Sequence, residues 1–184
     1  MADHIDFVVK QWANAMPALD VSSMEVFGRM LRIMKHLAKK RAKVLSALGF
    51  HEGDFDVLAT LRRAGEPYCL SPTTLYQSLL VTSGAMTNRL NRLEAQGLIV
   101  RLLDPSDKRS MRVALTETGL HLIEHALVLH VDMQNALLST LNDAQVQQLR
   151  HSLSQLLIST EEGGGAEESP QKNACTSSPL SLEG

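Results

Sequence analysis

Residues 104–119 read D-P-S-D-K-R-S-M-R-V-A-L-T-E-T-G and contain the pattern that decides the fold. Pro105 presets a turn, and an apolar strand over 111–115 follows it. Residues 98–103 predict a partner strand on the other side of the turn. The stretch therefore predicts a β-hairpin with basic residues around its tip. Taken alone, such a tip is either a solvated turn or a finger that touches a negatively charged partner.

Two short helices are predicted immediately before this hairpin. Ser71 is a suitable N-cap with Pro72 at the first helical position, and a turn at 81–83 leads to a second helix over 84–96. Gly97 is the expected stop of that second helix. Two short helices joined by a tight turn predict a helix-turn-helix, and the basic hairpin after it makes the unit a winged helix.

Further amphipathic helices are predicted on both sides of the winged helix, over 3–16, 22–48 and 54–64 before it and over 116–138 and 142–159 after it. Their apolar faces exceed what a winged-helix core can cover, so we expect them to pack against a second copy. The fold class is mainly α with a small β-hairpin wing, dimerised through the N- and C-terminal helices. We expect an extra N-terminal helix in 1–20, the winged-helix domain with its dimerisation helices in 21–160 and a disordered acidic tail in 161–184.

Composition limits the class of protein. The 184 residues are 44% apolar but only 4% aromatic, so the core should be mostly aliphatic. The sequence has neither a long apolar run nor a signal-peptide pattern, so we expect no membrane span and no secretion. Two cysteines without C-x-x-C spacing agree with a reducing compartment. We therefore expect a cytoplasmic protein.

Charge is segregated along the chain, although the formal net charge is only −2. Residues 29–43 contain Lys and Arg but no Asp or Glu, residues 83–112 are also rich in bases, and the segment from 161 onward is acidic. Local basic patches matter more for a polyanionic partner than the total charge does. This pattern favours contact with double-stranded DNA over a winged helix that is used only for protein contacts.

The predicted helix 84–96 has two different faces. Met86, Leu90 and Leu93 share one face, which should pack against the core. The opposite side presents small and amide side chains, which suit the major groove because Asn can pair with adenine and Thr can meet a thymine methyl. A solvated face on an ordinary helix is the alternative. The predicted DNA contacts of the helix-turn-helix are Ser71, Thr73, Ser83, Gly84, Thr87, Asn88, Asn91 and Arg92.

The tip of the hairpin supplies the remaining predicted DNA contacts. Asp107 and Arg109 lie two residues apart, so the carboxylate can hold the arginine extended. An extended Arg is favoured in a narrow minor groove because the negative potential is enhanced there. Lys108 suits a phosphate.

These features together resemble the MarR family of dimeric winged-helix regulators. The matching residues are G-L-I at 97–99, Asp107-x-Arg109, and Leu115-Thr116-x-x-Gly119. The resemblance covers about residues 20–158. It implies a homodimer that binds a pseudo-palindromic operator and regulates transcription, and it implies that the protein is not an enzyme.

A narrower resemblance is to the urate-responsive, PecS-like branch of this family. The matching residues are Trp12, Pro17, Leu19-Asp20, Met24, Gly28-Arg29, L-S-P at 70–72 and V-T-S-G-x-M-T at 81–87. The branch implies a ligand set of Trp12, Asp56, Arg89 and Arg101, an effector that is urate or a related purine anion, and no cofactor. It implies a repressor whose ligand disturbs an Asp56–Arg89 contact and thereby moves the groove-reading helix.

Each residue of this ligand set has another explanation. Trp12 could pack in the dimer interface, Asp56 could favour the dipole at the start of its helix, and Arg101 could contact a phosphate. The effector could also be another purine or a flat acid. Nevertheless, an indole offers a stacking face and a guanidinium can pair with an anion, so the chemistry of the set suits urate.

Two other sensing chemistries remain open at this point. His121-Leu-Ile-Glu124-His125 matches the H-x-x-E-H motif of zinc proteases, but no cleft or third ligand frames a catalytic site. A zinc-sensing regulator would need His36 or His51 in addition, and two exposed histidines one turn apart are the simpler interpretation. Cys69 could sense oxidants, although it is more simply interpreted as a small buried apolar residue.

Overall fold

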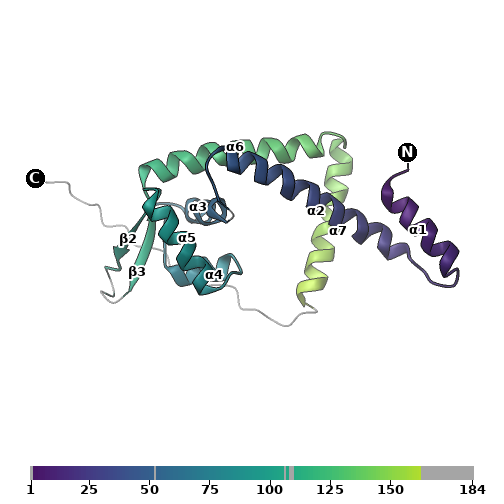
Figure 1. The fold of residues 1–184 in the computed structure, drawn as a ribbon, viewed down its shortest axis with the longest axis horizontal. Coiled ribbons are helices and arrows are strands. Elements are labelled where there is room, and N and C mark those ends of the chain that lie inside the picture. Colours follow the sequence, from purple (N-terminus) through teal and green to yellow (C-terminus); the bar gives the residue numbers. More distant parts are fainter. Residues whose placement is uncertain (1, 52, 106, 108–109, 163–184) are drawn as a thin grey trace, which may run out of the picture. The chain divides into compact units, whose positions relative to one another are not determined.

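The computed structural model describes residues 2–51, 53–105, 107 and 110–162. The chain forms two compact units, Met1–Val44 and Leu45–Gly184. Helix α1 (His4–Ala15) and most of α2 (Ser22–Ala47) belong to the first unit (Figure 1). The elements that follow α2 are α3 (Asp54–Arg63), β1 (Cys69–Leu70), α4 (Pro72–Ser78), α5 (Ser83–Ala95), β2 (Ile99–Leu103), β3 (Met111–Leu115), α6 (Glu117–Leu138) and α7 (Asp143–Glu162).

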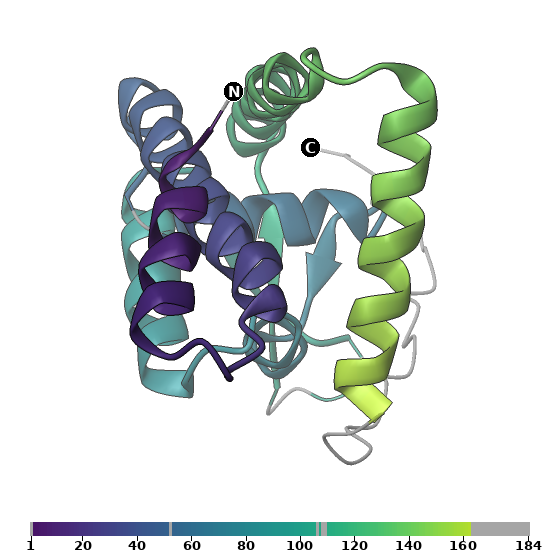
Figure 2. The ribbon, with the colours of Figure 1, turned by 90° about the vertical axis from the view of Figure 1, so that its right-hand side faces the viewer.

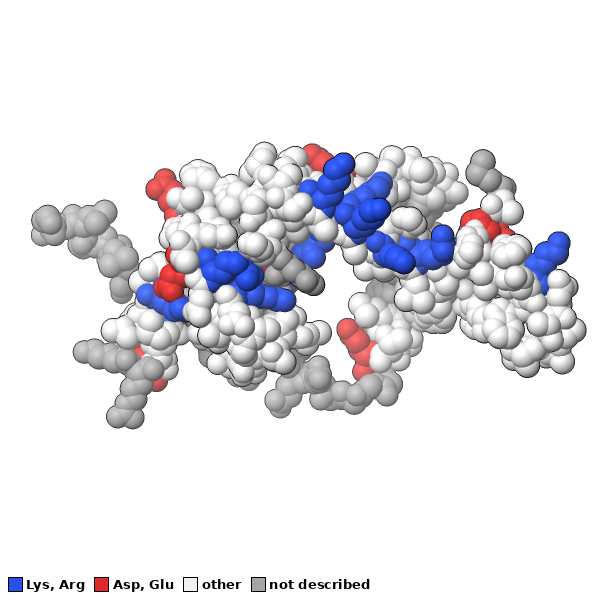
Figure 3. All heavy atoms as spheres, viewed as in Figure 1, with Lys and Arg blue, Asp and Glu red and all other residues white. Residues whose placement is uncertain are grey.

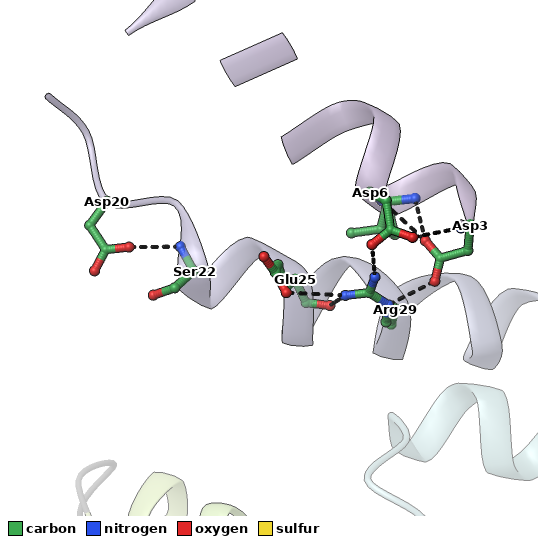
Figure 4. A network of polar contacts seen from close by, with 7 residues as sticks. Asp3, Asp6, Asp20, Ser22, Glu25 and Arg29 are labelled. Atoms are coloured by element: carbon green, nitrogen blue, oxygen red, sulfur yellow. Dashed lines mark hydrogen bonds and ion pairs between the residues drawn. The ribbon is translucent and has the colours of Figure 1, made fainter. Parts of the chain in front are cut away.

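The first unit is a pair of helices joined by a short connection. Asp3 caps α1 as predicted, because its carboxylate accepts hydrogen bonds from the N–H groups of Ile5 (2.7 Å) and Asp6 (3.2 Å). Asp20 accepts a hydrogen bond from the N–H of Ser22 (2.9 Å) where α2 begins (Figure 4). The first of these contacts fixes the start of α1, and the second lies where the connection ends and α2 begins.

Basic side chains follow one side of α2. At about 100° per residue, four of the seven basic side chains between residues 29 and 43 fall in one sector of the helix, and the apolar stripe that contains Met30, Leu37 and Val44 falls on the opposite side. Figure 3 shows Lys and Arg atoms along the length of α2. The residues of this basic sector are Arg32, Lys35, Lys39 and Lys43.

The core of the second unit is aliphatic, as the composition predicts. Met86, Leu90 and Leu93 of α5 are 1%, 2% and 0% exposed, which confirms the predicted inward face of that helix. They pack with side chains from the neighbouring helices and strands, among them Leu58, Leu61, Leu75, Val113 and Ile123. The core therefore fixes which side of α5 faces outward.

The wing belongs to a three-stranded antiparallel sheet in the order β1-β3-β2. The predicted hairpin is confirmed, with Ile99 paired to Leu115 and Leu103 paired to Met111. The sequence did not predict β1, in which Cys69 pairs with Ala114. This short strand ties the segment before α4 to the inner strand of the wing.

The two motifs 97–99 and 115–119 meet where α6 begins. The Thr116 hydroxyl accepts a hydrogen bond from the Gly119 N–H (3.0 Å) and donates one to the Gly97 carbonyl (2.8 Å). A Cβ on Gly119 would lie 1.9 Å from the carbonyl oxygen of Leu98. Glycine is therefore required for α6 to start this close to the end of α5.

Helices α6 and α7 continue the second unit beyond its core (Figure 2). No residue of α7 is buried. Large exposed apolar side chains on these two helices are Val128, Leu129, Val131, Leu138, Leu149, Leu153, Leu157 and Ile158. Glu161 and Glu162, which we predicted to lie in the disordered tail, extend α7, and the rest of that tail lies outside the described residues. Within the described part of the chain, none of the helices has the length and apolar character needed to span a membrane.

Candidate nucleic-acid interface and effector site

The outer face of α5 carries the predicted groove-reading side chains. Gly84, Thr87, Asn88 and Asn91 are all exposed, opposite the three core residues of the same helix. The helix begins at Ser83, one residue before the predicted start, and its N-cap Thr82 accepts a hydrogen bond from the Ala85 N–H (3.3 Å). The N-terminus of α5 is thus fixed by its own cap, and its outer face is available to a ligand.

Two side chains on this face are already oriented by neighbours. The Thr87 hydroxyl donates to the carbonyl of Ser83 (2.9 Å), so its polar group is used within the helix and its methyl remains for an apolar contact. The Asn91 side-chain oxygen accepts a hydrogen bond from Arg101 of β2 (2.7 Å). Asn91 is therefore held toward the wing strand and keeps its NH₂ group as a donor.

The first helix of the helix-turn-helix starts as predicted. Ser71 is half-buried and caps α4 through the Thr74 N–H (3.0 Å), while Thr73 is exposed. The turn before α5 contains Leu80, which is 85% exposed and has a φ of 50°. This left-handed conformation is costly for a residue other than glycine, so the turn is held by the packing of the two helices.

Arg92, one of the predicted DNA contacts, forms an ion pair inside the protein. Its guanidinium contacts the carboxylate of Asp54 at 2.5 Å, and Asp54 is fully buried at the start of α3. The other oxygen of Asp54 accepts a hydrogen bond from the N–H of His51 (2.9 Å). The hydrogen bond with Asp54 raises the pKa of Arg92 above its ordinary value. Arg92 thus joins α5 to α3.

The wing tip is partly described. Asp107 accepts a hydrogen bond from the Ser110 hydroxyl (2.7 Å), and the Asp104 carboxylate accepts one from Arg112 (2.6 Å). These contacts close the turn between β2 and β3. Lys108 and Arg109 lie outside the described residues, so the predicted Asp107–Arg109 brace stays a prediction.

Asp56, the predicted effector-binding carboxylate, lines a small cavity. It is half-buried in the first turn of α3, and the cavity has a volume of about 220 Å³. Its other lining residues are Ala59, Thr60, Arg63, Ser78 and Leu79. The cavity therefore joins α3 to the end of α4 and contains a carboxylate, a guanidinium and two hydroxyl groups.

The other three predicted effector residues are not among the residues that line this cavity. The Arg89 guanidinium lies against Gly53, where a Cβ would be 2.2 Å from the Arg89 Cζ atom. Arg101 forms an ion pair with Glu94 (2.7 Å) in addition to its bond with Asn91. Trp12 lies on α1 and is 39% exposed. A carboxylate–guanidinium pair between Asp54 and Arg92 joins α3 to α5. The expected contact between Asp56 and Arg89 stays a prediction.

The residues considered for metal or redox sensing are His121, His125 and Cys69. Among the described residues, no group of three or more His, Cys, Asp or Glu side chains could hold a metal ion. His121 and His125 are both exposed on α6, and His121 lies 3.9 Å from Glu117. Cys69 is half-buried in β1.

Sequence reasoning missed two residues of this region. Asp54 precedes the predicted Asp56 by two positions, and both lie in the first turn of α3, so the sequence offers no signal that Asp54 is the buried one. Arg63 lies in the last turn of α3, where a basic residue is expected simply to favour the helix dipole. Its place in the Asp56 cavity follows from the packing of α4.

Comparisons with known proteins agree with this architecture. The MarR family profile matches residues 48–110. The transcriptional regulator PecS of Dickeya dadantii (strain 3937) is 36% identical over 143 residues, which make up 78% of this chain and 86% of that protein. The chain belongs to the MarR family.

Two further likenesses place this MarR-family chain among transcriptional regulators, as predicted, and not among enzymes. The multiple antibiotic resistance protein MarR of Escherichia coli (strain K12) is 31% identical over 145 residues, covering 74% of this chain and 98% of that protein. The solved structure of a MarR mutant from E. coli in complex with operator DNA has a TM-score of 0.58 and 28% identity, over 76% of this chain and 99% of that chain.

Proposed function

We propose that the protein binds a pseudo-palindromic operator as a homodimer and represses transcription until a urate-like purine anion releases it. The observation that carries the DNA-binding part is the outer face of α5, where Gly84, Thr87, Asn88 and Asn91 are exposed while the inner face is locked in the core. Such a helix can enter the major groove without changing its own packing. The DNA complex of the E. coli relative supports the same use of the fold.

A second copy of the chain is the proposed partner of the exposed apolar helices. Within the single chain, α7 buries none of its residues, and α6 and α2 also expose large apolar side chains. Monomeric proteins rarely expose apolar patches of this extent, and a symmetric dimer covers the same surface on both copies. Two recognition helices then read two half-sites of a palindrome.

The effector is proposed to act at the start of α3. Asp56 in the first turn and Arg63 in the last turn of α3 both line the cavity. Just before Asp56, Arg89 of α5 lies against Gly53 and Arg92 of α5 pairs with Asp54. A purine anion that pairs with a guanidinium near Asp56 would place its charge beside that carboxylate and disturb this joint between α3 and α5. Because α5 also reads DNA, effector and operator would then oppose each other. Trp12, Arg89 and Arg101 complete the proposed ligand set.

DNA binding is tested on a fragment that the protein itself selects from a random pool. Asn88→Ala should weaken binding to this fragment by about 1–3 kcal/mol and leave binding to unrelated DNA nearly unchanged, because the amide reads a base. Asn14→Ala, an exposed amide on α1, is the matched control and should bind as wild type does. Affinity should fall steeply with salt. Absence of DNA binding at low salt would overturn the proposal.

A further inference from the structure

The first turn of α1 is built around two carboxylates. Asp3 accepts hydrogen bonds from two N–H groups of the turn, and the Asp6 carboxylate accepts one from the Asp3 N–H (2.6 Å). This reciprocal arrangement is a capping box, which fixes both side chains in place. The two carboxylates are therefore already ordered when a cation approaches them.

Arg29 of α2 binds both carboxylates. Its Nε lies 2.8 Å from Asp3, its Nη2 contacts Asp6, and its Nη1 lies 3.6 Å from the Glu25 carboxylate and 3.1 Å from the Glu25 carbonyl (Figure 4). Every nitrogen of the guanidinium thus has a partner. Because Glu25 is four residues earlier on the same helix, it also orients the arginine toward α1.

An apolar contact lies beside this cluster. Ile5 is only 8% exposed, and a Cβ on Gly28 would lie 3.0 Å from its Cδ1 atom. By contrast, residues 10–20, which include Trp12, are all exposed. The first turn is therefore the part of α1 that is fastened to α2, and the second half of α1 extends from it.

We propose that Arg29 is a positioning residue that fastens α1 to α2 and thereby sets the place of Trp12, the indole proposed to contact the effector. Trp12 lies nine residues beyond Asp3 on the same helix, or about 14 Å along its axis, so a shift at the first turn carries directly to the indole. This role rests on the proposed function, because Trp12 has a task there only if the effector is bound. The fastening of the helix itself does not depend on the effector.

Trp12 is the single tryptophan of the chain, so its fluorescence reports the state of α1 directly. The test compares wild-type protein with Arg29→Gln, which removes the ion pairs, and Gly28→Leu, which wedges Ile5 away without a change of charge. Arg32→Gln is the matched control, because Arg32 is an exposed arginine of the same helix. Acrylamide quenching of Trp12 and urate release from the selected DNA fragment are measured for each protein.

Both test variants should make Trp12 more accessible to acrylamide and raise the urate concentration for half-release by about fivefold or more. Their DNA affinity without urate should stay at the wild-type value, and Arg32→Gln should match wild type in the quenching of Trp12. Quenching in both variants that equals wild type would overturn the fastening role. If wild-type protein ignores urate, the proposed effector is wrong, and the quenching comparison still decides whether Arg29 positions Trp12.

Discussion

The carboxylate of Asp54 and the guanidinium of Arg92 join the first turn of α3 to the last turn of α5. The Asp54 side chain is fully buried, and Arg92 donates to it from Nε (3.1 and 3.2 Å) and from Nη2 (2.5 Å). A buried carboxylate needs such a partner, because leaving it unpaired is costly. The pair therefore fixes how the recognition helix sits on the helix that carries Asp56.

Removal of the arginine alone should destabilise the protein. Arg92→Met leaves the buried Asp54 carboxylate unpaired and should lower the free energy of unfolding by about 2–4 kcal/mol. The double variant Arg92→Met with Asp54→Asn has no buried charge at this position, so it should recover part of the lost free energy of unfolding. Urea unfolding at a fixed protein concentration measures both. If Arg92 served only as a phosphate contact, its removal would reduce the salt dependence of DNA binding and leave stability unchanged.

Replacement of Gly119 or Gly84 by alanine should have different effects on the stability of the protein. Gly119→Ala would place a Cβ against the backbone of Leu98 and should cost about 2 kcal/mol or more, because the carbonyl cannot move aside. At Gly84 a Cβ meets nothing within 4 Å, so Gly84→Ala should leave stability equal or slightly higher. Thermal unfolding measures both. Gly84→Ala should nevertheless weaken DNA binding, and normal affinity would exclude close approach of DNA at that position.

Arg101 has contacts that tie it to the recognition helix. Arg101→Ala releases Asn91 and Glu94, so it should weaken binding to the selected DNA by about 1 kcal/mol even without effector. A purely effector-binding arginine would change only the urate concentration for release. Fluorescence anisotropy with and without urate separates the two roles, and a variant that matches wild type in both assays would remove Arg101 from the mechanism.

The fastening of α1 should withstand moderate acidification. The hydrogen bond from Arg29 lowers the pKa of Asp3 below its usual 3.8. A lowered pKa in the folded state contributes stability that is present above the usual value and lost as pH falls through the lowered one. Quenching of Trp12 should therefore stay constant from pH 7 to about 5 and rise only below about pH 4. Release of α1 between about pH 5 and 7 would contradict a carboxylate-based contact.

The sequence was sufficient to predict the elements whose pattern is local. The 3.6-residue period placed Met86, Leu90 and Leu93 inward, and the Asp3 cap and the wing strands follow from short-range rules. Strand β1 was not predicted, because two residues are too few to show the alternation of apolar and polar side chains that marks a strand. Its pairing also depends on β3, which is distant in sequence.

The polar joints were harder to predict because they depend on packing. Asp54 and Asp56 share the first turn of α3, and only the packed structure shows that Asp54 is the one removed from water. The contact of Arg29 with Asp3 and Asp6 likewise joins two helices whose relative placement the sequence does not state.

The most direct test of the account is the anisotropy of a labelled, protein-selected DNA fragment during titration with urate, xanthine and a phenolate. Urate should release the DNA, and Asp56→Asn and Arg89→Ala should shift or abolish this release while the proteins stay folded. A complex that urate leaves intact, in conditions where the protein binds the same DNA specifically, would contradict the account.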